Sequence, residues 1–360
     1  MIAELGTAHG GSIAKAKTLI DAAVSAGADC VKFQIVYADE ILHPNTGIVP
    51  LPGGDTRLYD VFKELEVPPA FFAELKGYVE SKNAGFLASA FGPQSAEELK
   101  RLHPRAVKIA SPELNYTQLV REIARWRIPV FLSSGVSRLS DIEDAVALFD
   151  EAGTRDCITL LHCVTSYPAP LADCNLRLIV TLRALFGVKT GVSDHSLEAE
   201  PVPCVAAALG ASAIEKHFCL SRDDPGLDDP VALPPAHFAA MTQAVRETAE
   251  IRRKGGARGE EKALATLGER YGAGTVAAIL GDGIKRLSPS EEANYGRTNR
   301  SIHALADIPA GTLITAKNTA PLRTEKVLRP GLPPLLWEKI IGRPARAFIL
   351  SGEGVRFEDV

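Results

Sequence analysis

Residues 212–220 read SAIEKHFCL, a short apolar stretch with the composition of a buried strand that nevertheless carries three ionisable residues in a row. These residues are Glu215, Lys216 and His217. Burying an unpaired charge costs free energy, so the strand must bring these side chains to partners or to a polar site. Side chains alternate between the two faces of a strand, which puts Glu215 and His217 on one face and Lys216 on the other. The strand must therefore belong to a fold that makes one of its faces polar.

Seven further stretches have the same β-rich character, and helical patterns lie between them. Alternating strands and helices favour a parallel sheet, and eight strand–helix units over about 250 residues match a TIM (β/α)8 barrel. A dinucleotide-binding sheet is not indicated, because its GxGxxG turn is missing. Two helix starts, at Ser95 with Glu98 and at Ser140 with Glu143, have the spacing of capping boxes. The sequence predicts an α/β barrel over residues 1–255, with strands at 1–5, 30–35, 85–91, 106–111, 129–135, 157–163, 189–196 and 213–218.

The alternation stops near Gly255, where the chain becomes glycine-rich and charged. Residues 256–296 have the composition of a linker with one or two helical turns. Residues 297–360 contain short strand-like stretches punctuated by proline and glycine, which predicts a small β-rich second domain.

Composition excludes several classes of partner. The formal net charge is -4 over 360 residues, and no run of basic residues interleaved with aromatic ones occurs, so we expect no nucleic-acid binding. No apolar run approaches the roughly 20 residues of a membrane helix, and the N-terminus lacks the pattern of a signal peptide. We therefore expect a cytoplasmic protein without a membrane partner.

Polar residues gather at the C-terminal ends of all eight expected strands, whereas the N-terminal ends are apolar or carry turn residues. The C-terminal ends of barrel strands build the active site in this fold, so a shared polar site explains the pattern better than eight separate buried polar groups. The residues concerned are Glu4, Lys32, Gln34, Ser89, Lys108, Ser111, Ser133, His162, Thr165, Ser193, His195, Glu215 and His217.

The residue types at these ends indicate a chemistry. His195 and His217 come from neighbouring strands at matching depth, which would let two imidazoles bind one divalent cation and leave positions open for substrate. Lys32 and Lys108, with several hydroxyl groups, supply the donors that a phosphate or carboxylate needs. The candidates for a general acid or base are Glu4, Glu113 and Glu215. The residues alone thus predict a metal-assisted enzyme that acts on an anionic, phosphorylated small molecule.

Five motifs also occur in an order that resembles a known family. They are IAELGTAHGGSIAKAKTLIDAAVSAGADCVKFQ (2–34), VKIASPEL (107–114), LLHCVTSYPAP (160–170), GVSDHS (191–196) and IEKHF (214–218). The set resembles the N-acetylneuraminate (sialic acid) synthase family, which includes pseudaminic and legionaminic acid synthases and spore-coat polysaccharide homologues. The tail NRSIHALADIPAGTLIT (299–315), with RPG at 329–331, resembles the C-terminal antifreeze-like (SAF, β-clip) domain of that family.

The resemblance implies a reaction. Members of the family condense phosphoenolpyruvate with the open-chain aldehyde of an N-acylated amino sugar, which gives a nine-carbon 2-keto acid and phosphate for surface polysaccharide. A divalent ion, manganese or magnesium, assists. On this basis His195 and His217 would hold the metal that polarises the aldehyde for attack by C3 of phosphoenolpyruvate. Water would then add at C2, and phosphate would leave by C–O cleavage.

The resemblance also implies roles for individual residues. Glu4 and Glu215 would position metal-bound groups or move protons. Glu113 would face the sugar. Phosphoenolpyruvate would contact Lys32, Gln34, Ser89, Lys108, Ser111, Ser133 and Ser193. The sugar would contact Thr165, which stands where the family often has asparagine, and Tyr167, Asp228 and Arg329.

Family members are commonly dimers in which the SAF domain of one chain covers the barrel of the other, so Arg329 would reach the partner's sugar. The sugar-side residues depart from the family pattern more than the metal and phosphoenolpyruvate residues do, as at Gly226, Leu227 and Asp228 in place of Gly-Pro-Asp. The acceptor sugar therefore stays open. Two other functions also stay open: a non-catalytic saccharide-binding homologue with a scaffold barrel, and a metal-dependent aldolase that uses pyruvate.

Overall fold

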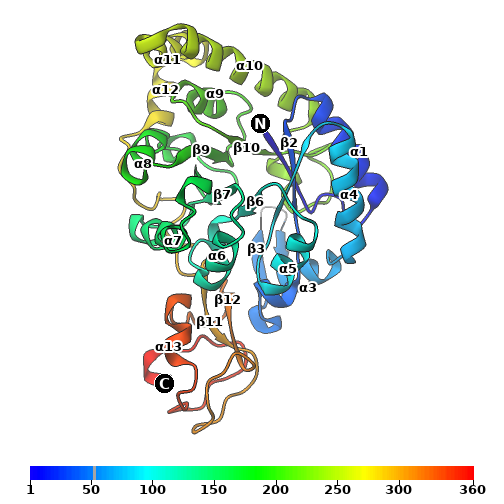
Figure 1. Ribbon diagram of the computed structural model, residues 1–360, viewed down its shortest axis with the longest axis vertical. Coiled ribbons are helices and arrows are strands. Elements are labelled where there is room, and N and C mark those ends of the chain that lie inside the picture. The colour runs from blue at the N-terminus through cyan, green and yellow to red at the C-terminus, as the bar shows by residue number, and fades with distance from the viewer. Residues whose placement is uncertain (52–53) are drawn as a thin grey trace.

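Eight parallel strands close into a barrel, as the alternation of strands and helices predicts (Figure 1). The structure is a computed structural model that describes residues 1–51 and 54–360. Around the barrel the strands run in the order β1-β10-β9-β8-β7-β6-β5-β2. They are β1 (Ile2–Gly6), β2 (Cys30–Gln34), β5 (Gly85–Ser89), β6 (Val107–Ile109), β7 (Val130–Ser133), β8 (Ile158–Cys163), β9 (Lys189–Asp194) and β10 (Ile214–His217).

Helices surround the barrel and bury their apolar faces against it. They are α1 (Ile13–Ser25), α4 (Pro69–Ser81), α5 (Pro93–Arg101), α6 (Thr117–Ala124), α7 (Leu139–Ala152), α8 (Leu178–Phe186), α9 (Pro201–Ala208) and α10 (Pro235–Lys254). Between β2 and α4 lie α2 (Ala38–Ile41), α3 (Leu58–Glu64) and a hairpin of β3 (Val49–Leu51) and β4 (Gly54–Thr56). This insertion supplies part of the wall above the barrel.

The two predicted capping boxes are wrong. Helix α5 begins at Pro93, a residue favoured in the first turn, so Ser95 lies in the third helical position and its hydroxyl accepts from the backbone N–H of Gly92 at 3.0 Å. Helix α7 likewise begins before Ser140, and Asp141 caps it by accepting from the N–H of Arg138 at 2.7 Å. In both cases the capping side chain lies inside the helix rather than ahead of it.

The segment after α10 is more ordered than a linker. It forms α11 (Gly259–Tyr271) and α12 (Ala273–Leu280), where one or two helical turns were expected. Ala263, Leu267, Val276 and Ile279 from these helices are buried in the same core as the barrel helices. Apolar residues at helical spacing therefore continue the barrel's outer layer past Gly255.

The C-terminal module projects from one side of the barrel and has a hydrophobic core of its own (Figure 1). It holds an antiparallel pair, β11 (Arg300–Ala304) and β12 (Thr319–Arg323), the short helix α13 (Trp337–Ile340), and turns joined by single bridges. It also contacts the barrel of the same chain. Arg300 exchanges two backbone bonds with the side chain of Asn115, and Asn299 donates to the carbonyl of Val136 at 3.0 Å.

Lys216, the middle residue of the opening motif, points away from the barrel interior. Its ammonium nitrogen lies 2.5 Å from Oδ2 of Asp194 and also donates to the carbonyls of Ser196 and Glu198. The side chain is 1% exposed, so this charge is buried but fully paired. The pair holds the loop after β9 against β10. No helix among the described residues is long and apolar enough to cross a membrane.

We expect Lys216→Met to destabilise the fold by about 3 kcal/mol, because it leaves the buried carboxylate of Asp194 without its counter-charge. The change is measured as the free energy of unfolding in urea at neutral pH. Lys254→Met is the matched control, because the side chain of Lys254 is 71% exposed and, within residues 1–51 and 54–360, forms an ion pair only with Glu250. Equal unfolding midpoints for the two variants would contradict the proposed role of the buried pair.

Candidate active site

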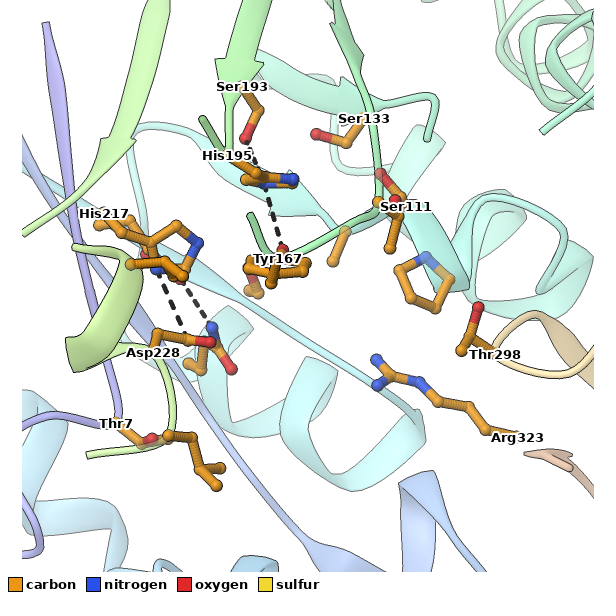
Figure 2. Close-up of a pocket in the computed structure, with 18 of the residues that line it drawn as sticks. Thr7, Ser111, Ser133, Tyr167, Ser193, His195, His217, Asp228, Thr298 and Arg323 are labelled. Atoms are coloured by element: carbon orange, nitrogen blue, oxygen red, sulfur yellow. Dashed lines mark hydrogen bonds and ion pairs between the residues drawn. The ribbon is translucent and has the colours of Figure 1, made fainter. Parts of the chain in front are cut away.

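A cavity of about 380 Å³ opens at the C-terminal ends of the barrel strands (Figure 2). Every strand or the loop after it contributes a polar side chain. The volume suits a small-molecule site. Three of the residues that the sequence places at the site, Glu113, His162 and Arg329, do not line it. The others do: Glu4, Lys32, Gln34, Ser89, Lys108, Ser111, Ser133, Thr165, Tyr167, Ser193, His195, Glu215, His217 and Asp228. The ring of His162 is instead buried, with its Nε2 2.6 Å from the carbonyl oxygen of Cys174.

Strand register explains why these residues meet. Glu4 of β1 lies opposite Lys32 of β2 on one side and His217 of β10 on the other. Glu215 lies opposite Ser193 of β9, and Lys108 of β6 lies opposite Ser89 of β5. Alternation then turns every second residue of each strand inward, at the same level of the barrel.

Two lysines and two glutamates form the charged floor of the cavity. Oε1 of Glu215 lies 3.0 Å from the ammonium of Lys108 and 3.3 Å from that of Lys32. Oε1 of Glu4 lies 3.0 Å from Lys32 and accepts from the amide of Gln34 at 2.7 Å. Burial opposes charge on Glu215, but the two ammonium groups outweigh it and lower the pKa of this carboxyl. Glu215 is therefore ionised at neutral pH.

The lysines differ in their surroundings. Burial lowers the pKa of Lys108, and the nearby Lys32 lowers it further, against the opposing effect of Glu215. Burial also acts on Lys32, but Glu215 and Glu4 outweigh it and raise its pKa. An ammonium has three N–H donors, and the ion pairs occupy one on Lys108 and two on Lys32. Donors remain on both residues for an anion in the cavity.

Buried hydroxyl groups stand beside these lysines. Within residues 1–51 and 54–360, the hydroxyl oxygens of Ser89, Ser133 and Thr165 are buried and find no hydrogen-bond partner. Ser193 donates to Glu215 at 2.9 Å, and Ser111 accepts from the N–H of Gly135 at 3.0 Å. Buried polar atoms are nearly always paired in proteins, so unpaired hydroxyls that line a cavity are the mark of a ligand site.

His195 and His217 face each other across the cavity with ring centroids 5.6 Å apart. Nδ1 of His195 lies 2.6 Å from the carbonyl oxygen of Val164, which can only accept, so Nδ1 carries the proton and Nε2 is the acceptor of the ring. Burial, and then repulsion from His217, lower the pKa of His195 to about 3 and keep the ring neutral. The hydroxyl of Tyr167 donates to Nε2 at 3.1 Å.

This arrangement fits a divalent cation. A neutral imidazole whose other nitrogen donates to a backbone carbonyl is the usual form of a metal-binding histidine. Nδ1 of His217 lies 3.5 Å from Oδ2 of Asp228, which adds a carboxylate beside the pair. Among the described residues, no three His, Cys, Asp or Glu side chains form a closed metal cage. His195 and His217, with Asp228 nearby, are the residues that could hold such a cation.

Glu113 lies behind the wall of the cavity. It is fully buried, and its Oε1 accepts from the guanidinium groups of Arg300, at 2.9 Å, and Arg323, at 2.7 Å. A carboxylate held by two arginines is poorly suited to move protons or to contact the sugar. Its placement therefore argues against both predicted roles. The sequence did not reveal this placement, because it depends on pairing with two arginines from the C-terminal module.

Arg329 lies away from the cavity of its own chain. Its guanidinium donates to the carbonyl of Gly354 and to Asp359, both at 2.8 Å, inside the C-terminal module. This position leaves the predicted contact with a partner chain untested.

The cavity also has a wall that sequence reasoning missed. Arg323 reaches it from the end of β12, Glu325 and Lys326 from the turn that follows, and Asn294 and Thr298 from the segment before β11. No sequence signal marks them, because their position depends on how the module packs on the barrel. Apolar residues from the insertion and other loops complete the opening: Val49, Leu58, Phe62, Phe91, Leu227 and Val231.

Comparison with known proteins agrees with this geometry. The model of the NeuB family matches residues 19–256, and the model of the SAF domain matches residues 299–360. The chain belongs to the NeuB family. The matched regions correspond to most of the barrel and to the C-terminal module, which is a SAF domain.

Relatives within the NeuB family align over nearly the whole chain. The spore coat polysaccharide biosynthesis protein SpsE of Bacillus subtilis is 34% identical over 99% of this chain and 88% of its own length. The pseudaminic acid synthase of Campylobacter jejuni is 31% identical, over 100% of this chain and 96% of its own. The crystal structure of Bacillus subtilis SpsE superimposes with a TM-score of 0.81 and covers 100% of this chain and 94% of that chain, at 31% identity.

The floor of the cavity predicts a pH dependence. The pKa of Glu215 is lower in the folded state than its ordinary value of 4.5, so its charge stabilises the fold above that pH and the contribution is lost as the pH falls below it. We expect the free energy of unfolding to fall more steeply toward about pH 3 in the wild type than in Glu215→Gln. The difference in slope is at most about 1.4 kcal/mol per pH unit.

Urea denaturation at a series of pH values measures both slopes. Glu292→Gln, at an exposed position, is the control and should keep the wild-type slope. Parallel curves for Glu215→Gln and the wild type would show that Glu215 is not held ionised by the lysines.

Proposed function

We propose that the protein condenses phosphoenolpyruvate with the open-chain aldehyde of an N-acylated amino sugar, giving a nine-carbon 2-keto sugar acid and phosphate for surface polysaccharide. The observation that carries the proposal is the convergence of two buried lysines and several unpaired buried hydroxyls on one cavity with two histidines. The NeuB family relatives named as pseudaminic acid synthases, and the reaction class of such transferases, support the same conclusion.

Phosphoenolpyruvate is the ligand that the floor suits. Lys32 and Lys108 would donate to its phosphate and carboxylate oxygens with the N–H groups that their glutamate partners leave free. The unpaired hydroxyls of Ser89 and Ser133 would add neutral donors. Ser111, Ser193 and Gln34 complete the predicted set at the same level of the barrel. This binding would hold C3 of the enol toward the histidines.

His195 and His217 would hold a divalent cation, manganese or magnesium. When bound, the cation supplies positive charge that polarises the aldehyde oxygen of the acceptor. The hydrogen bond from Nδ1 of His195 to Val164 fixes the ring so that Nε2 faces the cavity. The single O–H of Tyr167 donates to Nε2 of His195, and it would become available to an oxygen of the acceptor if that nitrogen bound the cation.

The reaction forms a bond from C3 of the enol to the aldehyde carbon as the C=O π bond opens, and the aldehyde oxygen takes a proton to become a hydroxyl. Water adds at C2 and releases a proton, and phosphate leaves by C–O cleavage. Oε2 of Glu4 is buried without a partner in the described part of the chain and could take the proton that the water releases. Glu215, whose lowered pKa keeps it ionised, would hold both lysines in place. Asp228, Thr165 and Tyr167 would contact the acceptor sugar.

We also infer a homodimer with exchanged SAF domains. The module carries large apolar side chains that are more than half exposed in the single chain, among them Val327, Phe348, Leu350 and Phe357. Exposed apolar side chains gathered on one small unit favour a protein interface. A partner that covers them could also bring its own Arg329 to the sugar. Phosphoenolpyruvate is an intracellular metabolite, so we infer a cytoplasmic reaction, which cell fractionation tests.

Purified protein with manganese should release phosphate from phosphoenolpyruvate only when a suitable N-acylated hexosamine is added. The assay measures free phosphate across N-acetylmannosamine and diacetamido hexoses, and mass spectrometry identifies the nine-carbon acid. Phosphate release from no acceptor would overturn the synthase. Condensation with pyruvate in place of phosphoenolpyruvate would favour an aldolase, and sugar binding without any product would favour a non-catalytic homologue.

The same assay tests the histidine pair. His217→Ala should abolish metal-dependent turnover and weaken manganese binding, which calorimetry measures without turnover. His237→Ala, outside the cavity lining, is the matched control. Unchanged manganese binding in His217→Ala would refute the metal assignment.

The dimer makes a separate prediction. The double variant Phe348→Asp and Leu350→Asp should shift the protein from dimer to monomer in analytical ultracentrifugation, because buried carboxylates without partners would oppose the interface. The same double change at exposed positions of the barrel, Leu185→Asp and Val180→Asp, should leave the mass unchanged. A monomeric wild type would refute the proposal.

A further inference from the structure

The loop that follows β7 has a strained backbone next to the cavity. Its residues 134–137 are buried, and Val136 has a φ of +40°. A β-branched residue in the left-handed region is a steric outlier, which persists only where the surrounding structure holds it. The loop begins directly after Ser133, which lines the cavity. The strain at Val136 therefore lies three residues from the proposed phosphoenolpyruvate site.

The segment that precedes the SAF domain supplies the groups that hold this loop. Oε1 of Glu291 accepts from the backbone N–H of Val136 at 2.8 Å. The ammonium of Lys285 donates to the carbonyl oxygen of Ser134 at 3.1 Å. Glu291 is buried, and its second carboxylate oxygen accepts from the hydroxyl of Ser288 at 2.9 Å. A buried carboxylate needs such bonds, so Glu291 is fixed in place and can fix its partners.

The same carboxylate oxygen also holds the loop that follows β8. Oε1 of Glu291 accepts from the backbone N–H of Thr165 at 2.7 Å. Thr165 lines the cavity, and two residues later Tyr167 donates to His195. Hydrogen bonds to an ionised oxygen are stronger than those between neutral groups. One atom of Glu291 thus joins the loops of two neighbouring barrel strands.

The two loops approach each other too closely for a side chain to fit between them. A Cβ on Gly135 would lie 2.2 Å from Oγ1 of Thr165 and 3.0 Å from Oγ of Ser111. The backbone N–H of Gly135 also donates to that hydroxyl of Ser111 at 3.0 Å. A movement of the backbone at Val136 would therefore displace hydroxyl groups that line the cavity.

Glu291 is expected to stay on its own barrel if the SAF domains are exchanged. The segment leaves α12, which is buried in the barrel core, and stays bound to the loop after β8. The N–H of Gly283 donates to the side chain of Asn175 at 2.8 Å. The N–H of Ser290 donates to the side chain of Asp173 at 3.1 Å. The point of exchange would therefore fall after Glu291.

We propose that Glu291 is a positioning residue of the synthase, which holds Val136 in its strained conformation. It would thereby set the hydroxyls of Ser111 and Ser133 for phosphoenolpyruvate. The inference rests on the proposed function, which supplies this ligand. Glu291 does not line the cavity, so it would act only through the two loops. Without Glu291, Val136 would relax and carry the loop with it, whereas a glycine adopts a positive φ without steric cost.

The test begins with Glu291→Ala. Calorimetry with manganese present measures the binding of phosphoenolpyruvate, and hydrogen exchange with mass spectrometry follows the peptides that contain Val136 and Thr165. We expect binding to weaken about 10- to 100-fold and both peptides to exchange faster, because two hydrogen bonds to a charged group are lost. Glu292→Ala, at the exposed neighbouring position, should match the wild type in both measurements.

A second change at Val136 separates positioning from a structural role. Added to Glu291→Ala, Val136→Gly should recover most of the binding, because the loop no longer has strain to release. Val136→Ala should recover none, because it keeps the Cβ that disfavours a positive φ. Both double variants should melt no higher than Glu291→Ala, since each loses buried apolar atoms. Binding would then recover in one of them although stability recovers in neither.

Equal recovery by Val136→Gly and Val136→Ala, or recovery by neither, would overturn the inference. Unchanged hydrogen exchange in Glu291→Ala would also overturn it. Wild-type protein that binds phosphoenolpyruvate but releases no phosphate with any acceptor would refute the synthase and leave the binding cycle to decide the inference. If Glu291→Ala does not fold, Glu291→Gln should show a smaller loss with the same pattern of recovery, because a neutral amide oxygen accepts more weakly.

Discussion

The carboxylate of Glu215 is the contact on which the floor of the site depends. Two lysines could not both be charged at the centre of a barrel without a counter-charge, and Glu215 lies within 3.3 Å of each ammonium. Glu4 provides a second negative charge, so the floor is close to neutral before any ligand binds. An anionic substrate would therefore compete with the two glutamates for the N–H donors of the lysines. It would not enter a pocket of large net positive charge. Such a floor can be buried and stable while still holding free N–H donors for phosphate.

Strand periodicity accounts for what the sequence could predict. Alternation at Glu215 and His217, or at Lys32 and Gln34, is a local property, and closure of parallel strands brings all such pairs to one level of the barrel. The barrel and nearly all residues around its floor could be read in this way. The buried pairing of Lys216 with Asp194 follows the same rule, since both residues face outward on neighbouring strands. The chemistry of the reaction lies on the most predictable part of the chain.

Residues that depend on packing between distant segments could not be predicted. Glu113 follows β6 and has the sequence character of a site residue, but two arginines 187 and 210 positions later hold it behind the wall. The same packing brings Arg323 and Lys326 to the cavity from the end of β12 and the turn after it, which have no marked pattern. Helices α11 and α12 were underestimated because glycine and charged residues obscure the helical spacing of their apolar residues. Those apolar residues pack against α9 and α10, which the sequence alone does not place nearby. The capping boxes failed for a local reason, the early start that Pro93 gives to α5.

The contrast between residues on barrel strands and residues on loops has a consequence for the choice of acceptor sugar. In the proposed reaction, phosphoenolpyruvate and a metal would contact residues that barrel strands hold in register, and these residues cannot move far without breaking strand pairing. The acceptor sugar would contact the insertion after β2, the loop that carries Asp228 and the turn after β12, which line the cavity and share no such constraint. A change in any of these loops can alter which sugar fits and leave the charged floor intact. The anchor formed by Arg300 and Glu113 then has a second effect, because it couples the position of Arg323 to the seating of the whole SAF domain. A dimer contact that displaced the SAF domain would therefore move Arg323 and alter this wall of the cavity, whereas the charged floor would keep its position.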